Sequence, residues 1–158
     1  MQCAHARYYL QTYGCQMNEN DSEKIAGMLE ALGYEPADSP ADADLIILNT
    51  CCVRRTAERK VYGRIGQLKR LKEQNPNLIL AVCGCMVQQE SELTVLDRDY
   101  PYVDLIFGTH NLHRLPELLR QVMTDRTRVI EVWESEGEIV EDLPVKHKPG
   151  FQACVTVM

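Results

Sequence analysis

The segment Leu45-Ile46-Ile47-Leu48-Asn49-Thr50-Cys51-Cys52 decides the fold class of this 158-residue chain. Its first four residues form a short apolar run, which is typical of a β-strand buried on both faces of a sheet. A long amphipathic helix is expected directly after it, since apolar residues recur there at every third or fourth position: Val53, Ala57, Val61, Ile65, Leu68 and Leu71. Asn75-Pro76 would end this helix. A buried strand followed at once by a long helix indicates a parallel α/β sheet.

The same alternation of strands and helices continues on both sides of this segment. Further strands are expected at residues 7–12, 78–82, 103–107 and 128–132, and further helices at 20–32, 86–96 and 112–122. The first of these helices would begin at Asn20, which Glu23 follows at the spacing of a capping box. The order predicts an α/β fold with a mostly parallel sheet and helices on both faces, the three-layer arrangement of Rossmann-like and flavodoxin-like folds. The pattern does not determine the order of the strands.

Three of the seven cysteines follow three of the expected strands. Cys15 comes after the first strand, Cys51 after the second and Cys85 after the third, at separations of 36 and 34 residues. Each separation is about the length of one strand–helix–strand unit. Because the carboxyl ends of parallel strands share one edge of the sheet, we expect these loops to meet there. The remaining cysteines are two neighbours of this site and two near the chain ends: Cys52, Cys83, Cys3 and Cys154.

Three converging thiolates suit a particular kind of metal chemistry. Thiolates select zinc, copper(I) or iron–sulfur clusters, and structural zinc sites usually take four ligands, often in C-x2-C pairs that this chain lacks. A cubane cluster can be held by three cysteines with one iron left open. Gly14 and Gly84 beside the cysteines would allow close approach of the backbone. The alternatives are buried structural cysteines and a zinc- or thiol-containing binding or redox module.

The composition restricts the class of protein. Hydrophobic residues make up 45% of the chain and charged residues 25%, which is typical of a packed globular domain. The net charge of −6 excludes a generally basic nucleic-acid-coating protein. No apolar run is long enough to span a membrane, and no signal peptide is evident, so we expect a cytoplasmic protein. In a reducing compartment the cysteines are not expected to form a disulfide framework.

Three motifs resemble those of the radical-SAM methylthiotransferases. They are Thr12-Tyr13-Gly14-Cys15-Gln16-Met17-Asn18, Asn49-Thr50-Cys51-Cys52-Val53-Arg54 and Cys83-Gly84-Cys85. The form Gly-Cys-Gln-Met-Asn is similar to that of the MiaB branch, which modifies tRNA. The resemblance covers about residues 7–131 and identifies this region as the N-terminal methylthiotransferase domain. It implies that Cys15, Cys51 and Cys85 bind an auxiliary [4Fe–4S] cluster.

The resemblance also implies a reaction for a longer protein. In this family, sulfur is inserted at C2 of N6-isopentenyladenosine at position 37 of tRNA and then methylated. A second [4Fe–4S] cluster, on a C-x3-C-x2-C motif, cleaves S-adenosylmethionine to a radical. That motif is absent here, so no catalytic residue is assigned, and the chain alone is expected to be an inactive, sulfur-donating module. The implied partners are tRNA, the radical-SAM and RNA-binding domains of the same protein, and a sulfur donor of unknown identity.

The composition changes after Trp133. Residues 133–150 are rich in acidic residues and proline, which is typical of a linker. Residues 151–158 then resume an alternating, strand-like pattern. We therefore expect the methylthiotransferase domain at 1–132, an acidic linker at 133–150, and the truncated first strand of the radical-SAM barrel at 151–158.

Basic residues are concentrated on the long helix. Eight of the 17 fall between residues 53 and 72, and Arg54, Arg55 and Arg59 lie nearest to the cysteine loop. These three are candidates for contact with RNA phosphates. The alternative is an ordinary solvated helix face, and Arg64 is expected to pair within the protein. The four histidines, His5, His110, His113 and His147, are interpreted as solvent-facing or capping residues.

Overall fold

The computed structural model describes residues 6–14, 16–50 and 55–132, and within them the chain alternates between strands and helices. The strands are β1 (Arg7–Thr12), β2 (Glu35–Pro36), β3 (Leu45–Thr50), β4 (Ile79–Gly84), β5 (Leu105–Phe107) and β6 (Val129–Glu131). The α-helices are α1 (Gln16–Ala31), α2 (Arg55–Gln74), α3 (Glu90–Asp99) and α4 (Leu115–Asp125). Three short 3-10 helices are η1 (Pro40–Asp42), η2 (Cys85–Gln88) and η3 (Thr109–Arg114). The expected linker and barrel strand, residues 133–158, lie outside the described residues.

All six strands belong to one parallel sheet, which confirms the predicted fold class. The strand order is β2-β1-β3-β4-β5-β6. This is the flavodoxin-like order, with its topological switch point between β1 and β3. In such sheets, ligands bind outside the carboxyl ends of the strands at the switch point. The fold thus predicts a ligand site at the carboxyl ends of β1 and β3, next to the end of β4.

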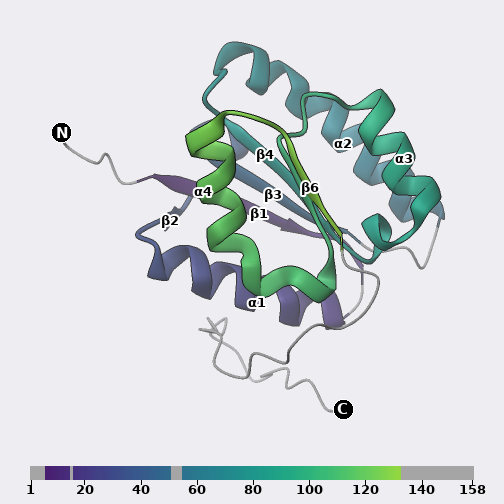
Figure 1. Cartoon of the computed structure of the whole chain (residues 1–158), viewed down its shortest axis with the longest axis horizontal. Helices are drawn as coiled ribbons and strands as arrows, with labels where there is room; N and C mark the ends of the chain where they lie inside the picture. The colour runs from purple at the N-terminus through teal and green to yellow at the C-terminus, as the bar shows by residue number, and fades with distance from the viewer. Residues whose placement is uncertain (1–5, 15, 51–54, 133–158) are drawn as a thin grey trace.

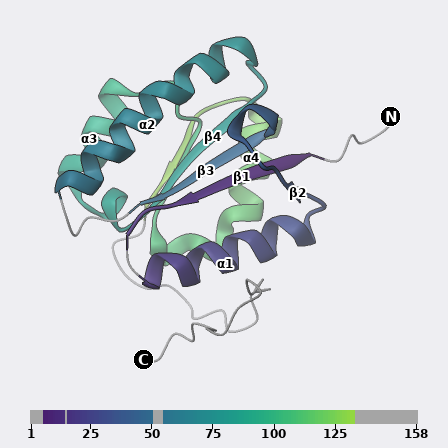
Figure 2. The same ribbon diagram turned by 180° about the vertical axis from the view of Figure 1, so that it is seen from behind.

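Helices cover both faces of the sheet, as predicted (Figures 1 and 2). On one face, α1 and α4 pack against alternate strand residues that include Leu45, Ile47 and Phe107. On the other face, α2 and α3 pack against the intervening residues, such as Ile46 and Leu48. All six residues of β3 are buried, which explains why this strand is apolar without alternation.

Two helices begin elsewhere than expected. The prediction that α1 starts at Asn20 is wrong, because the helix already begins at Gln16 and Asn20 is buried within it. A turn at Gly14, whose φ is 111°, directly follows β1 and leaves room for the extra helical turn. The single helix expected at 86–96 is instead η2 followed by α3, which starts at Glu90. The two-residue strand β2 is too short to give a periodic signal.

No helix in the described part of the chain is both long and apolar enough to cross a membrane.

Candidate metal centre

The three residues that directly precede the predicted ligands lie at one edge of the sheet. Gly14 follows β1, while Thr50 and Gly84 end β3 and β4. The Tyr13 amide donates to the Asn49 carbonyl at 2.8 Å, and Thr50 pairs with Gly84 in the β3–β4 register. The predicted convergence of these strand ends is therefore confirmed. Cys15, Cys51 and Cys52 themselves lie outside the described residues.

Glycine is required where β4 meets β3. Gly84 has a φ of 104°, in the region that disfavours residues with a Cβ. A Cβ at this position would lie 2.2 Å from the Thr50 carbonyl oxygen and 2.8 Å from Asn49 Oδ1. No side chain therefore fits between the backbone of Thr50, at the end of β3, and the backbone of Gly84, at the end of β4.

Cys83 and Cys85 have opposite surroundings, although only one residue separates them. Cys83 belongs to β4, and its side chain is buried in the core with α1 and α4. Burial raises the pKa of the Cys83 thiol, and the nearby Asp21 and Cys85 raise it further. Cys85 begins η2 and is only partly buried. Because metal ligation needs the thiolate, Cys85 is the better placed of the two to serve as a ligand.

A buried hydrogen-bond network, here called the Asn18–Asn49 network, lies beneath this edge. Asn18 Nδ2 donates to Asn49 Oδ1 at 3.2 Å and to the Thr50 carbonyl at 2.8 Å. Asn49 Nδ2 donates in return to the Asn18 carbonyl at 2.8 Å and to Ser22 Oγ at 3.0 Å. Ser22 also bonds to Thr12 Oγ1 at 2.6 Å, and the Thr50 hydroxyl donates to the Cys83 carbonyl at 2.5 Å. The network joins the start of α1 to the ends of β1, β3 and β4.

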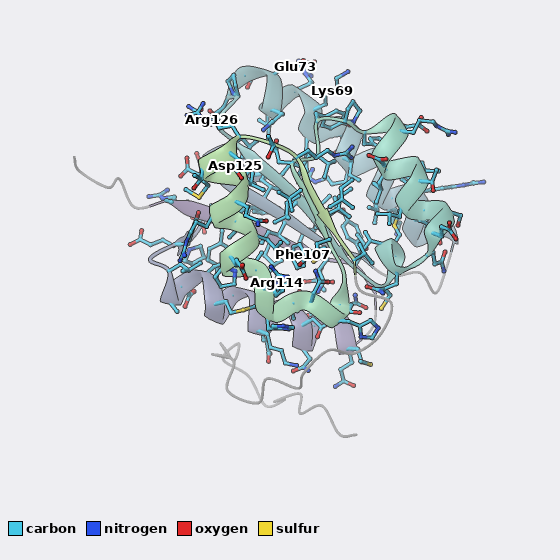
Figure 3. The ribbon with its side chains drawn as sticks, viewed as in Figure 1. Lys69, Glu73, Phe107, Arg114, Asp125 and Arg126 are labelled. Carbon is cyan, nitrogen blue, oxygen red and sulfur yellow. The ribbon has the colours of Figure 1, made fainter. Side chains whose placement is uncertain are left out.

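A second polar cluster fixes the neighbouring loops. Asn111 Oδ1 accepts from the Gly108 amide at 2.8 Å, and its Nδ2 donates to the Glu131 carbonyl at 2.7 Å. Gln88, the last residue of η2, accepts from the Thr109 amide at 3.2 Å. Arg114 completes the cluster by pairing with Glu131 at 2.9 Å. Figure 3 places Arg114 and Phe107 at the end of the molecule opposite to Lys69, Glu73 and Arg126.

Helix α2 carries an exposed basic face. Arg59, Lys60 and Arg70 are exposed, and no ion pair joins them to another described residue. Arg64 instead donates to Gln11 Oε1 at 3.0 Å, which confirms that it pairs within the protein. Arg55 begins α2, but its side chain, like the whole of Arg54, lies outside the description.

The sequence predicted that the ends of β1, β3 and β4, each followed by a predicted cysteine ligand, lie at one edge of the sheet, which is here called the cysteine edge. It did not predict most of the Asn18–Asn49 network. It anticipated that Asn49 bonds to the loops, and it assigned no role to Asn18, Ser22 or Thr50. An Asn at the end of a fully apolar strand was the available signal, since buried amides are almost always hydrogen-bonded. His110 and His113 lie in η3, and both are only partly buried, whereas His5 and His147 lie outside the described residues.

The donor set fits a metal group only if the three loops act together. Within residues 6–14, 16–50 and 55–132, no three His, Cys, Asp or Glu side chains are placed to hold a metal ion. Cys85 is the one predicted ligand among these residues, and it stands at the meeting point of the three strand ends. The close backbones and the partly buried thiol are compatible with a soft metal group held by cysteines from separate loops.

Comparison with known proteins agrees with this description. Residues 7–108 match the family described as "Uncharacterized protein family UPF0004". The chain is similar to proteins named tRNA-2-methylthio-N(6)-dimethylallyladenosine synthase. It is 54% identical over 152 residues to that of Bacillus licheniformis, covering 96% of this chain and 30% of the relative. The corresponding protein of Clostridium tetani is 54% identical over 151 residues, covering 96% of this chain and 33% of the relative.

The chain thus spans about a third of the length of the curated relatives that it matches. The family match covers more than half of the chain, from β1 through β5. It contains the ends of β1, β3 and β4 and the three predicted cysteine ligands that follow them in the sequence. On this match, the chain belongs to the UPF0004 family.

Proposed function

We propose that this chain is the auxiliary [4Fe–4S]-binding, sulfur-donating module of a radical-SAM methylthiotransferase, with Cys15, Cys51 and Cys85 as the cluster ligands. The observation that carries the proposal is the meeting of three strand ends. Gly14, Thr50 and Gly84 each directly precede one of these cysteines, and the Gly84 backbone lies against Thr50. Three thiolates from separate loops suit a cluster with one open iron better than a four-ligand structural zinc site.

The chain's own contribution, within the described residues, is to leave the Cys85 thiol partly exposed and to bury the Cys83 thiol. The cluster, when bound, would supply an open iron at which sulfur destined for the substrate can bind. Cys85 is partly exposed at the start of η2, where its thiolate is available as a ligand. Cys83 is buried in the core between the sheet and α1 and α4, which keeps its thiol away from the solvent-facing edge.

The substrate that we propose follows from the names of the relatives. They are synthases of tRNA 2-methylthio-N(6)-dimethylallyladenosine, and we infer that the longer protein adds the methylthio group at C2 of N(6)-dimethylallyladenosine in tRNA. The second cluster, S-adenosylmethionine and the C–H activation step would belong to parts beyond this chain, which has no C-x3-C-x2-C motif. We expect no turnover from the chain alone, and a reducing, cytoplasmic setting for the thiolates.

We further propose that residues 1–132 form the module, that 133–150 link it to the radical-SAM domain, and that 151–158 begin that domain's barrel. The module covers the whole described sheet, from β1 to β6. Limited proteolysis of the full-length protein checks this boundary. We expect the protease to cut within residues 133–150 before it cuts within residues 6–132. Preferential cleavage inside the sheet would contradict the boundary.

The proposed tRNA contact is made by the basic residues that follow the Cys51 loop in the sequence, Arg54, Arg55 and Arg59, of which Arg59 lies exposed on α2. In the full-length protein, charge reversal at Arg55 and Arg59 should weaken tRNA binding and reduce the slope of log affinity against log salt by about one to two. A matched control reverses two charges on α4 and at its end, Arg120 and Arg126, where both residues are exposed. Equal losses in the two double variants would leave α2 with no special role.

The test of the function is a cysteine series. The chain and its variants Cys15→Ala, Cys51→Ala, Cys85→Ala and Cys83→Ala are reconstituted anaerobically with iron and sulfide. Bound iron and the visible absorption of the cluster are then measured. We expect each of the first three variants to lose most of the cluster and Cys83→Ala to retain it. A full cluster in Cys51→Ala or Cys85→Ala would overturn the ligand assignment, and tightly bound zinc in place of iron would favour a zinc-binding module.

A further inference from the structure

The Asn18–Asn49 network touches every strand end that leads into a predicted ligand. Asn18 lies three residues after Cys15, and Asn49 lies two residues before Cys51. Asn18 and Asn49 are each 1% exposed. The Asn18 amide donates to the Asn49 side chain, and the Asn49 amide donates to the Asn18 carbonyl. Through Thr50, the network extends to the carbonyl of Cys83, two residues before Cys85. A single set of buried hydrogen bonds therefore joins the three cysteine-bearing segments.

Stability alone does not explain this network. A buried amide must recover by hydrogen bonding what it loses by leaving water, so the net gain from each bond is modest. Replacing both side-chain partners of such a bond by apolar groups of similar shape can be nearly neutral for stability. A buried polar network does, however, impose one relative position on the segments that it joins, because any slip leaves donors and acceptors unsatisfied. Asn49 belongs to such a network and lies near the end of β3, directly after the four apolar residues of that strand.

We propose that Asn49, bonded to Asn18, is a positioning residue that holds the three cysteine loops in the register that the cluster requires. The inference rests on the proposed function and goes beyond its ligands. Outer partners that orient metal ligands typically contribute about 10–100-fold to metal affinity when they are removed. Asn49 acts here through the side chain and carbonyl of Asn18 and through Ser22, and Asn18 in turn donates to the Thr50 carbonyl.

The chain offers a matched control at the same edge. Asn111 is also fully buried, and it makes the same kind of bonds, to the Gly108 amide and the Glu131 carbonyl. Its bonds join the ends of β5 and β6, which carry no cysteine. The bond from the Thr109 amide to Gln88 of η2 does not involve the Asn111 side chain. Removing the Asn111 amide should therefore lower thermal stability while leaving the Thr109–Gln88 bond and the Asn18–Asn49 network in place.

The experiment compares Asn49→Ala, Asn18→Ser and Asn111→Ala in the 158-residue chain after anaerobic reconstitution. Three quantities are measured: iron release to a chelator, the EPR spectrum of the reduced cluster, and the melting temperature. We expect iron release to accelerate about tenfold or more in Asn49→Ala and Asn18→Ser, with an altered EPR line shape. Asn111→Ala should melt lower but release iron within about twofold of the wild-type rate, the small change left when no partner of a ligand is lost. Asn18→Ser leaves β3 unchanged and gives the answer if Asn49→Ala does not fold.

Two outcomes would overturn the inference. One is a wild-type rate and spectrum in a folded Asn49→Ala or Asn18→Ser variant. The other is an equal acceleration in Asn111→Ala, which would mean that general loosening of the edge releases iron. If the wild-type chain takes up no cluster, the proposed function fails first and the inference falls with it, so the two failures are distinguishable.

Discussion

Gly84 lies so close to Thr50 across the β3–β4 register that a Cβ on Gly84 would be 2.2 Å from the Thr50 carbonyl oxygen and 2.6 Å from its nitrogen. Both atoms belong to the backbone of a buried strand and cannot move aside cheaply. The positive φ of Gly84 adds a second reason for glycine. This contact leaves no room for a side chain at position 84 between the ends of β3 and β4.

Gly84→Ala should therefore be strongly destabilising. We expect a loss of about 2 kcal/mol or more in the free energy of unfolding, from steric overlap and backbone strain together. Urea denaturation followed by circular dichroism measures it. The matched control is Gly63→Ala on α2, where a Cβ has open space and no positive φ. That variant should gain about 0.5–1 kcal/mol, the usual advantage of Ala over Gly in a helix. Equal stabilities in the two variants would contradict the close contact.

Asp21 should make stability depend on pH. Burial raises the pKa of its carboxyl above the ordinary value, and the neighbouring Lys24 offsets only part of that rise. The folded state thus favours the protonated form, so the favourable contribution is complete below the ordinary pKa and is lost as the pH rises through the folded pKa. Asp21→Asn removes this dependence. We expect the variant to gain stability relative to wild type at pH 7 and to show no such gain at acidic pH.

Urea denaturation of Asp21→Asn and wild type at several pH values between about 3 and 7 checks the sign, because the ordinary Asp pKa falls within that range. Asp125→Asn, at the exposed end of α4, controls for the general effect of replacing Asp by Asn. A relative gain that is largest at the acidic end would contradict the assignment, since it would mean that the folded state favours the Asp21 carboxylate.

Cys83 and Cys85 should differ in reactivity toward alkylating reagents. Cys83 is buried with a raised pKa, while Cys85 is only partly buried. The thiolate is the reactive form, so iodoacetamide at neutral pH should label Cys85 in the metal-free protein and leave Cys83 unlabelled until the chain unfolds. Peptide mapping by mass spectrometry resolves the two sites. Labelling of Cys83 in the native protein at the rate of Cys85 would place its thiol outside the core.

The sequence predicted most of the sheet because its strands are buried on both faces. Continuous apolar runs such as Leu45–Leu48 can be recognised without any knowledge of the partner strands. The strand order was not predictable, because it depends on contacts between segments far apart in the sequence. The start of α1 was misplaced because periodicity treats asparagine as a surface or capping residue. Asn18 and Asn20 are instead buried in the first turns of the helix.

The candidate site was predictable to a similar extent. Topology and spacing were enough to bring the ends of β1, β3 and β4 together, because parallel strands share their carboxyl edge. Periodicity carried no information on the hydrogen bonds between Asn18, Asn49 and Ser22, which depend on side-chain geometry. The different burial of Cys83 and Cys85 likewise depends on where β4 ends, since Cys83 lies within the strand and Cys85 follows it.

The metal content of the reconstituted wild-type chain tests the central claim most directly. The chain is treated anaerobically with iron and sulfide, desalted, and analysed for iron, sulfide and zinc. The account predicts about four irons and four sulfides per chain, with visible absorption typical of a [4Fe–4S] cluster and little zinc. One tightly held zinc per chain without sulfide would contradict it, and would make the three strand ends a structural zinc site instead.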